Sequence, residues 1–318
     1  MSNAKMDLSV IIVCYKGWER LSKCLESLNA FVSGSFSMEV IVVDNNSGDG
    51  IINEFENKFK RFRFIRNNLN GGYAYGCNKG AAEASGDFLL ILNPDTVVRE
   101  KEIEKLLANA KSHPEYYIIS CRQVSENGKE SRAAGRFPAL SLRNLFIWKP
   151  DNTLSFPDWV SGSLMLTGRE IFNRLNGFDE SFWMYYEDVD ICKRARMAGG
   201  EIACYNDIVI EHNHGGSSRI NIKTTSITKC EVQISRHLYI HKYFRGLKRF
   251  LFQLIVIADN LLTGIIAGAI GLLFFFVPKI FIRFIILLRL IKYYWDSLLR
   301  RSWISTRSVI TSKASYKS

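Results

Sequence analysis

The sequence predicts an α/β fold whose sheet is covered by helices on both faces, followed by an apolar helical region. Short apolar runs rich in Val and Ile alternate with helical stretches through the first hundred residues. That alternation is typical of a mainly parallel sheet buried on both sides. Residues 251–277 are almost wholly apolar, and most of the excess positive charge surrounds them. These observations predict a catalytic-sized α/β domain with a helical appendage.

The individual elements follow from the positions of the apolar runs. We expect four strands and four helices in strict alternation. The expected strands are 8–13, 40–43, 62–66 and 88–92, and the expected helices are 18–28, 51–59, 73–83 and 101–110. In open sheets of this kind, ligands bind beyond the carboxyl ends of the strands. The loops after the first, second and fourth strands should therefore face one crevice.

Charge and cysteine content narrow the class of protein. The net charge is +11, and the 13 Lys and Arg residues after residue 241 face only two Asp residues there, so residues 1–241 are neutral. A basic segment beside a long apolar run favours an anionic membrane surface over a nucleic acid. The seven scattered cysteines form no C-x-x-C pair and indicate a reducing compartment.

Motifs spread over residues 7–220 resemble inverting family 2 glycosyltransferases of the GT-A fold, in the branch that includes bacterial rhamnosyltransferases. They occur in the expected order at 8–15, 40–47, 70–80, 92–96, 159–162, 177–180, 186–190 and 212–217. The resemblance implies a Rossmann-like mixed sheet flanked by helices. It also implies transfer of a sugar from a nucleotide-diphosphate donor.

The resemblance implies a donor site at the strand ends. Tyr15 would lie against the nucleobase and Asp44 would accept a hydrogen bond from its edge. Gly72 would let the backbone approach the donor, and Asn78 would project into the pocket from the next helix. The triplet Asn93-Pro94-Asp95 resembles the D-x-D metal motif with Asn in the first place.

A divalent cation fits this chemistry, because carboxylate oxygen holds Mn²⁺ or Mg²⁺ and the metal neutralises charge on a departing diphosphate. Asp95 is the expected ligand. His212 is the expected second ligand, since its spacing to Gly215 and Ser217 matches the family pattern H-x-x-G-x-S. His214 lies two residues further along and is the alternative ligand.

The acceptor side and the catalytic base are expected in one acidic, aromatic segment. Crowding of Glu187, Asp188 and Asp190 favours a raised proton affinity, as a general base requires, and the resemblance implies that the base is Asp188. Asp190 is expected to pair with Arg194 four residues later. Glu187 is either an acceptor-side residue or a solvated acid at the helix start. The other tentative acceptor-side residues are Trp159, Trp183 and Tyr186.

Taken together, these features predict an inverting, metal-dependent enzyme that moves a single sugar onto a hydroxyl acceptor. The resemblance suggests rhamnose, a dTDP- or UDP-sugar donor, and a lipid-linked or glycan acceptor in bacterial-type surface polysaccharide or glycolipid assembly. One alternative is a processive polysaccharide synthase, since 233–237 is an incomplete Q-x-x-R-W signature with His237 in place of tryptophan. A noncatalytic membrane-bound nucleotide-sugar binding protein is the other alternative.

The expected division is a catalytic domain at 7–225 and a helical membrane-associated region at 226–318. Residues 251–277 are long enough to cross a bilayer, and 280–295 form a second apolar stretch that contains Arg283, Arg289 and Lys292. A single crossing would place the basic tail outside, against the positive-inside tendency. We therefore expect a hairpin or an interfacial pair of helices at the cytoplasmic face of the cell membrane, in contact with anionic lipids and without nucleic acid.

Overall fold

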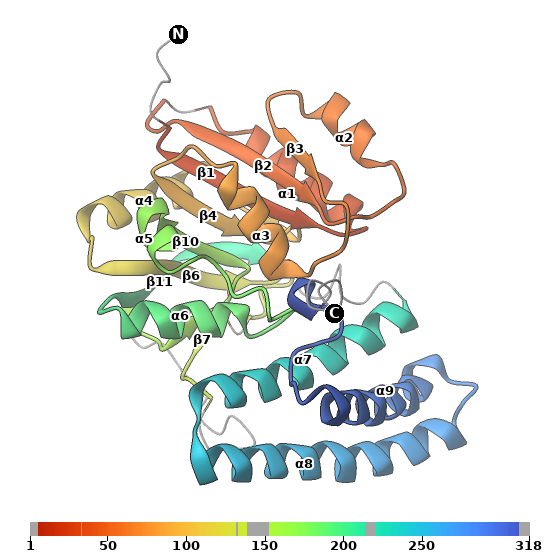
Figure 1. Ribbon diagram of the computed structural model, residues 1–318. Coiled ribbons are helices and arrows are strands. Elements are labelled where there is room, and N and C mark those ends of the chain that lie inside the picture. Colours follow the sequence, from red (N-terminus) through yellow and green to blue (C-terminus); the bar gives the residue numbers. More distant parts are fainter. Residues whose placement is uncertain (1–5, 33, 132, 139–152, 214–220, 312–318) are drawn as a thin grey trace. The chain divides into compact units, whose positions relative to one another are not determined.

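The chain folds into two compact units (Figure 1). The structure is a computed structural model that describes residues 6–32, 34–131, 133–138, 153–213 and 221–311. The first unit comprises the described residues up to 137 together with 153–179 and 187–213. The second unit comprises mainly residues 180–186 and 221–311.

A nine-stranded mixed sheet forms the centre of the first unit, in the order β3-β2-β1-β4-β10-β6-β11-β5, with β8 paired to β11. The strands β1 to β4 run parallel, whereas β10 is antiparallel to β4 and to β6. The strands of this sheet are β1 Leu8–Cys14, β2 Met38–Asp44, β3 Arg63–Arg66, β4 Phe88–Leu92, β5 Thr96–Val97, β6 Tyr116–Val124, β8 Leu154–Ser155, β10 Leu164–Gly168 and β11 Glu201–His212. A separate two-stranded sheet pairs β7 Ala134–Gly135 with β9 Trp159–Val160.

Helices cover both faces of this sheet because alternate strand residues point to opposite sides. Ile12 and its even-numbered neighbours in β1 pack against α1 Trp18–Asn29, α2 Ile52–Lys58 and α4 Glu100–Ser112. Ile11 and Val13 pack instead against α3 Tyr73–Ala82, α5 Arg169–Arg174 and α6 Glu187–Met197. The predicted α/β architecture is confirmed, and the eight expected elements agree with the observed ones to within two residues.

Helix α3 approaches β1 closely through two glycines. A Cβ atom on Gly76 would lie 2.6 Å from Val13 Cγ1, and one on Gly80 would lie 2.5 Å from Ile11 Cγ2. Neither position has room for a side chain. Glycine at both positions therefore allows α3 to lie directly on the sheet. The close packing fixes the N-terminus of α3 at the carboxyl edge of the strands.

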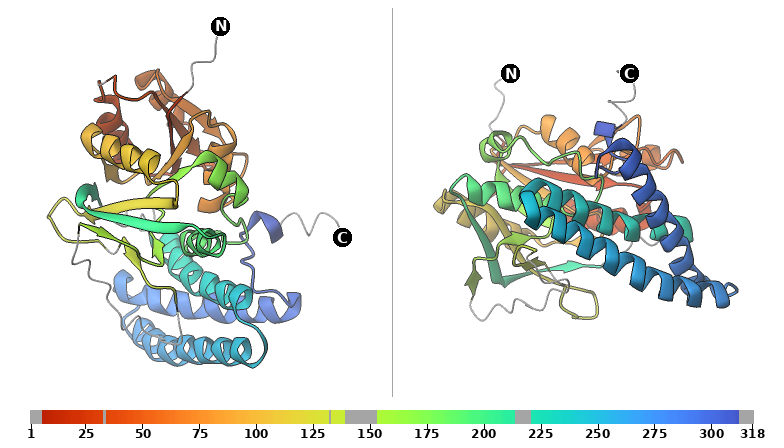
Figure 2. Two further views of the ribbon diagram at one scale, coloured as in Figure 1. Left: turned by 90° about the vertical axis from the view of Figure 1, so that its left-hand side faces the viewer. Right: turned by 60° about the horizontal axis from the view of Figure 1, so that its bottom comes forward.

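The second unit is built from three long helices, α7 Ile222–Tyr243, α8 Gly246–Leu273 and α9 Pro278–Arg300. α8 and α9 run side by side as a hairpin, and α7 packs against both (Figure 2). Within the part of the chain that the structure describes, α8 is the one helix whose length and apolar composition would allow it to cross a membrane. The expected division after residue 225 lies within α7 and stays a prediction.

A buried polar cluster joins the three helices of the second unit. His237 on α7 is fully buried, bonds through its two ring nitrogens to Gln253 on α8 and to the Tyr294 hydroxyl on α9, and stacks on Trp303 with ring centroids 4.8 Å apart. The Asn260 side chain donates to the same Tyr294 hydroxyl at 2.8 Å. The residue that replaces tryptophan in the processive-synthase signature thus holds this helical unit together.

Candidate functional site

The loops after β1 and β2 are tied into one edge. Cys14 lies opposite Asp44 in the parallel pairing of the two strands. The Ser47 hydroxyl accepts from the Lys16 N–H at 2.9 Å, and the Ser47 N–H donates to Asp44 Oδ1 at 3.0 Å. Asp44 is buried and Tyr15, between Cys14 and Lys16, is half-buried. Tyr15 and Asp44, the two predicted nucleobase contacts, therefore lie at the same hydrogen-bonded edge of the sheet. Their roles at the nucleobase stay predictions.

The N-terminus of α3 is fastened to this edge by Asn45, a residue that the sequence analysis did not single out. Its amide nitrogen donates to the Gly72 carbonyl at 2.9 Å, and its amide oxygen accepts from Asn67 at 3.0 Å. Gly72 has φ 90° and ψ 179°, a backbone region that essentially only glycine occupies. The predicted need for glycine at position 72 thus has a conformational cause.

Asp95 and His212 meet because β5 pairs with the end of β11. His212 lies opposite Thr96 in this antiparallel ladder, and the Asn213 N–H donates to the Asp95 carbonyl at 2.9 Å. The His212 Nε2 atom is 3.3 Å from Asp95 Oδ1, and both side chains are buried, with His212 3% and Asp95 8% exposed. Two residues 117 positions apart in the sequence therefore share one small site.

Hydrogen bonding orients the His212 ring and favours one tautomer. The Oε1 atom of Gln123 lies 2.8 Å from His212 Nδ1 and accepts from the Ser163 hydroxyl at 2.7 Å. Because this oxygen is an acceptor, Nδ1 carries the ring proton. The Asn93 amide nitrogen, 3.5 Å from Nε2, faces the lone pair on that atom. An imidazole with its only proton on Nδ1 would direct the Nε2 lone pair at the Asp95 carboxylate, and a cation between the two atoms would relieve their repulsion.

Asp95 and His212 would supply two protein ligands, as predicted from the sequence. No group of three or more His, Cys, Asp or Glu side chains that could hold a metal ion occurs among residues 6–311 where the structure describes them. A two-ligand site fits Mn²⁺ or Mg²⁺ when substrate phosphate oxygens complete the coordination. The alternative ligand His214 lies outside the described residues.

Asp188 stands at the beginning of α6 and is held by main-chain donors. Its Oδ2 accepts from the Gly162 N–H at 3.1 Å, and its Oδ1 accepts from the Val189 N–H at 2.8 Å. The Tyr73 hydroxyl donates to the Gly162 carbonyl at 2.7 Å, so the first residue of α3 braces the same segment. Burial raises the pKa of the Asp188 carboxyl above its ordinary value, although these hydrogen bonds oppose the rise.

Two adjacent residues connect the proposed base to the Asp95 and His212 pair. Gly162 holds Asp188, and the next residue, Ser163, accepts from the Asn93 N–H through its carbonyl at 2.9 Å. The Ser163 hydroxyl also holds Gln123, which in turn holds His212. Sequence reasoning missed Gln123 and Ser163 because neither is acidic, aromatic or part of a quoted motif. Ser163 directly follows the family motif at 159–162, and this position in the sequence could have indicated that it belongs to the site.

The other two carboxylates near Asp188 differ from each other in environment. Asp190 is fully buried and pairs with Arg194 at 2.8 Å, as predicted. Arg194 also donates to the carbonyls of Leu175 and Gly177, so this pair holds the chain before α6. Glu187 is 6% exposed, which contradicts the solvated-acid alternative. Burial raises the pKa of Glu187 well above its ordinary value, and the nearby Asp188 charge raises it further.

Two predicted site residues have main-chain partners that give them a place in the fold. The Asn78 amide donates to the Phe178 carbonyl at 2.8 Å and accepts from the Phe178 N–H at 2.9 Å. Asn78 therefore holds the turn before α6, and its expected role at the donor stays a prediction. Trp159 donates from Nε1 to the Arg136 carbonyl at 2.9 Å in the small two-stranded sheet.

Trp183 and Tyr186 belong to the second unit, where they contact its helices and C-terminal segment. The Arg307 guanidinium lies over the Trp183 ring at 5.6 Å from its centroid. Tyr186 packs on Tyr239 of α7 with ring centroids 5.5 Å apart. The acceptor-side roles of Trp159, Trp183 and Tyr186 remain predictions.

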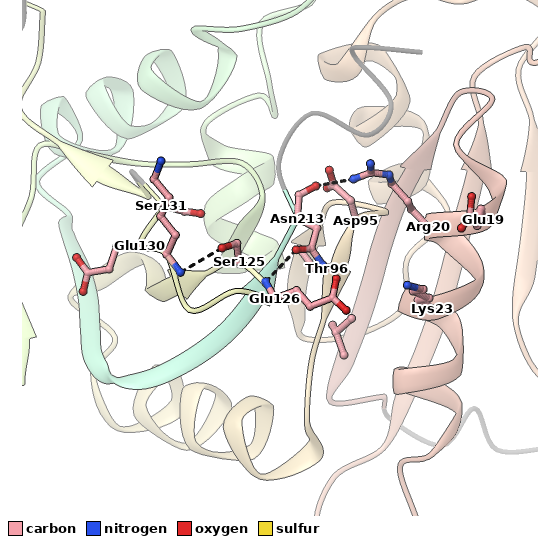
Figure 3. Close-up of a pocket in the computed structure, with 12 residues that line it drawn as sticks. Glu19, Arg20, Lys23, Asp95, Thr96, Ser125, Glu126, Glu130, Ser131 and Asn213 are labelled. Carbon is pink, nitrogen blue, oxygen red and sulfur yellow. Dashed lines mark hydrogen bonds between the residues drawn. The ribbon is translucent and has the colours of Figure 1, made fainter.

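A polar cavity of about 540 Å³ opens beside Asp95 (Figure 3). Asn213 forms part of its wall and is fixed from two further elements: Arg20 of α1 donates to its carbonyl at 2.7 Å, and the Glu126 N–H donates to its Oδ1 at 3.0 Å. The strand that carries His212 is thereby clamped immediately after the histidine. The cavity is lined by Glu19, Arg20, Lys23, Asp95, Thr96, Val97, Ser125, Glu126, Lys129, Glu130, Ser131 and Asn213.

The carboxylate and amide side chains of the site lie at the carboxyl ends of the strands in a Rossmann-like sheet. Open α/β folds of this class bind their ligands at that edge. Within this class, the family model described as "Glycosyl transferase family 2" matches residues 9–185. The chain belongs to this family and is a glycosyltransferase.

Curated relatives agree with this membership. The chain is 31% identical over 222 residues to the low-salt glycan biosynthesis hexosyltransferase Agl10 of Haloferax volcanii, covering 65% of this chain and 67% of that protein. It is 26% identical over 210 residues to rhamnosyltransferase WbbL of Escherichia coli K12, covering 60% and 77%. A third relative, N-acetylglucosaminyl-diphospho-decaprenol L-rhamnosyltransferase of Mycobacterium tuberculosis, is 27% identical, covering 60% and 71%. The predicted rhamnosyltransferase-like relationship is confirmed.

Solved structures confirm the predicted GT-A fold. The mannosyltransferase PcManGT from Pyrobaculum calidifontis, in complex with GDP-Man and Mn²⁺, has a TM-score of 0.54 at 16% identity, covering 81% of this chain and 70% of that chain. TarS residues 1–349 of S. aureus in complex with UDP-GlcNAc also has a TM-score of 0.54 at 16% identity, covering 80% and 72%.

Proposed function

We propose that this protein is an inverting, divalent-cation-dependent glycosyltransferase that moves one sugar from a nucleotide-diphosphate donor to a hydroxyl acceptor. The observation that carries the proposal is the continuous connection from Asp188 through Gly162 and Ser163 to Gln123 and His212. A carboxylate suited to proton abstraction and a pair suited to a cation are thereby held in one rigid arrangement.

The chain's residues would divide the chemistry between them. Asp95 Oδ1 and His212 Nε2 would hold Mn²⁺ or Mg²⁺ together with donor oxygens. The bound cation would supply positive charge against the diphosphate as it leaves. Tyr15 and Asp44 would orient the nucleobase. Gln123 would keep the His212 lone pair directed at the cation.

Asp188 would act as the general base. It would take the proton of the acceptor hydroxyl while that oxygen bonds to the anomeric carbon and the carbon–oxygen bond to the nucleoside diphosphate breaks. A single displacement of this kind inverts the anomeric centre. The raised pKa of Asp188 supports this role because it increases the proton affinity of the carboxylate.

The donor and acceptor classes are proposed from the relatives. Two of the relatives are named as rhamnosyltransferases, and the name of one specifies a diphospho-decaprenol acceptor. We therefore favour rhamnosyl transfer from a dTDP- or UDP-linked sugar to a lipid-linked or glycan acceptor in surface polysaccharide or glycolipid assembly. A lipid-linked acceptor also suits a site at the cytoplasmic face of a membrane, to which the basic, apolar second unit would attach the enzyme.

Calorimetry with a panel of UDP-, dTDP- and GDP-sugars, each with Mn²⁺, with Mg²⁺ or with chelator, tests the proposal. At least one donor should bind only with a cation, and Asp95→Ala should abolish that dependence. Asp207→Ala, an exposed carboxylate on the same strand as His212, is the matched control and should bind normally. Cation-independent binding, or a retained anomeric configuration in the product by NMR, would contradict the proposal.

A further inference from the structure

The outer faces of α8 and α9 carry large exposed apolar side chains along most of their length. On α8, Leu254, Leu262, Ile265 and Ile266 are 45%, 65%, 55% and 65% exposed. On α9, exposed apolar side chains recur at helical spacing at Leu288, Ile291, Trp295, Leu298 and Leu299. Positions three and four apart share one side of a helix, so each helix presents an apolar stripe, with Lys292 about 40° from Leu288 on α9 and Asp259 about 60° from Leu262 on α8. Contiguous exposure of this size marks a surface with a partner.

These stripes are separate from the contacts that hold the hairpin together. Leu287 of α9 packs against Gly264 and Gly268 of α8, where added Cβ atoms would lie 3.2 Å and 2.8 Å from its side chain. The buried side chains of α9 include Ile282, Leu290 and Tyr293, which lie about 100–180° around the helix from Leu288. The hairpin is thus already packed on its inner faces, and the outer stripes remain.

The turn between the helices is apolar as well. Phe274, Phe275 and Phe276 are 44%, 67% and 67% exposed. A hairpin that crossed a bilayer completely would place these three rings in water on the far side. The turn therefore disfavours a full crossing.

The positions of the cations disfavour insertion of the hairpin with its turn first. Lys279 is exposed three residues after Phe276, and Arg283 is exposed one turn later. Both would enter the hydrocarbon with the turn, at a substantial energetic cost. Around the axis of α9, however, Lys279 and Arg283 lie about 180° and about 140° from Leu288. A helix axis parallel to the membrane keeps both cations outside the hydrocarbon while the stripe enters it.

We propose that α8 and α9 lie in the plane of the membrane interface, with their apolar stripes among the acyl chains of one anionic leaflet. This inference rests on the membrane attachment in the proposed function and specifies its geometry. Charge complementarity identifies the partner, because residues 242–318 carry 13 Lys and Arg against two Asp. Amphipathic helices with a basic polar side bind such interfaces.

Flotation of the full chain with vesicles of phosphatidylcholine, with or without phosphatidylserine, tests the partner. The wild type should float with anionic vesicles, less so at high salt. Ile291→Glu and Leu298→Glu should each weaken binding roughly tenfold or more, since each removes an aliphatic side chain that would lie among the acyl chains. Val32→Glu replaces a 90% exposed apolar residue of the first unit and should bind like the wild type. Unchanged flotation of both stripe variants would overturn the proposal.

Thiol labelling of protein bound to preformed vesicles tests the geometry. All seven native cysteines are buried, so a new surface cysteine is selectively reactive. A membrane-impermeant maleimide should label Lys279→Cys without detergent and should label Phe275→Cys only with detergent. Protection of Lys279→Cys until detergent is added would show that the hairpin enters or crosses the bilayer and would overturn the in-plane arrangement.

Two further measurements separate the remaining outcomes. If a second copy of the chain covers the stripes, light scattering should show a dimer that Ile291→Glu dissociates, with no flotation, and the lipid assignment would be wrong. Cation-dependent donor binding, measured by calorimetry in the same variants, should be normal throughout. Its absence in the wild type would refute the proposed function independently of flotation.

Discussion

Replacing Gln123 by Met removes one oxygen that two buried donors share. The Oε1 atom of Gln123 accepts from His212 and from Ser163, and the side chain is 1% exposed. Met keeps the length of the side chain but cannot accept a strong hydrogen bond. The His212 ring is then free to place its proton on Nε2, where it would block the cation. The expected result is weaker binding of Mn²⁺ in the presence of donor.

The size of the effect follows from the proposed role of His212 as a metal ligand, with Gln123 as its hydrogen-bond partner. Loss of such a partner costs about 10–100-fold in metal affinity. That factor corresponds to about 1.4–2.8 kcal/mol. Stability should also fall, since the buried His212 N–H left without an acceptor costs about 1–3 kcal/mol, whereas the Ser163 hydroxyl keeps the Ser161 hydroxyl as an acceptor at 3.0 Å. The unfolding experiment therefore accompanies the binding experiment.

Calorimetric titration of Mn²⁺ at saturating donor is the assay, and Gln123→Glu is the matched control. Glu keeps an acceptor for the Nδ1 proton, so its Mn²⁺ affinity should stay near that of the wild type. Nitrogen NMR of the wild-type His212 ring should report the proton on Nδ1. Unchanged affinity in a folded Gln123→Met variant, or a proton on Nε2 in the wild type, would refute the reasoning.

Three further predictions concern the base, its neighbour and the glycine at the start of α3. Asp188→Asn should leave cation-dependent donor binding intact and lower kcat by about 10² to 10⁴, and stopped-time turnover assays at saturating donor check this; near-normal turnover would remove Asp188 as the base. Glu187→Gln should raise the free energy of unfolding at neutral pH, because a carboxyl whose folded pKa is raised contributes stability at low pH that is lost as pH rises from its ordinary pKa through the raised value. Urea unfolding at acid and neutral pH measures the difference, and an equal effect at both would contradict the assignment. Gly72→Ala should destabilise the fold by about 1–3 kcal/mol through its φ of 90°, whereas Gly34→Ala, with nothing within 4 Å of an added Cβ, is the control.

The sheet and its helices were predictable because their signal is local. The strands β1 and β4 are runs of mostly buried apolar residues, and a residue such as Ile11 needs only its alternation with Ile12 to be placed on one face. The pairing of Asp190 with Arg194 was predictable for the same reason, since one helical turn separates them.

The links within the site were not predictable from local pattern. Gln123 and His212 are 89 residues apart, and their contact exists only because β6 lies beside β11 in the sheet. The hydrogen bonds of Asn78 were not predictable for a related reason. Its partner is the main chain of Phe178, 100 residues away, and a side chain that bonds to main chain leaves no mark in the partner's residue type.

The adjacency of Gly162 and Ser163 has a consequence for how such an enzyme can diversify. Since two consecutive residues hold both the proposed base Asp188 and the Gln123 side chain behind His212, an insertion or deletion there would displace both parts of the proposed site at once. Changes of sugar or acceptor are more readily accommodated in segments that carry only one function. Deep mutational scanning should therefore find the pair intolerant to length changes, and engineering of specificity should begin elsewhere in the chain.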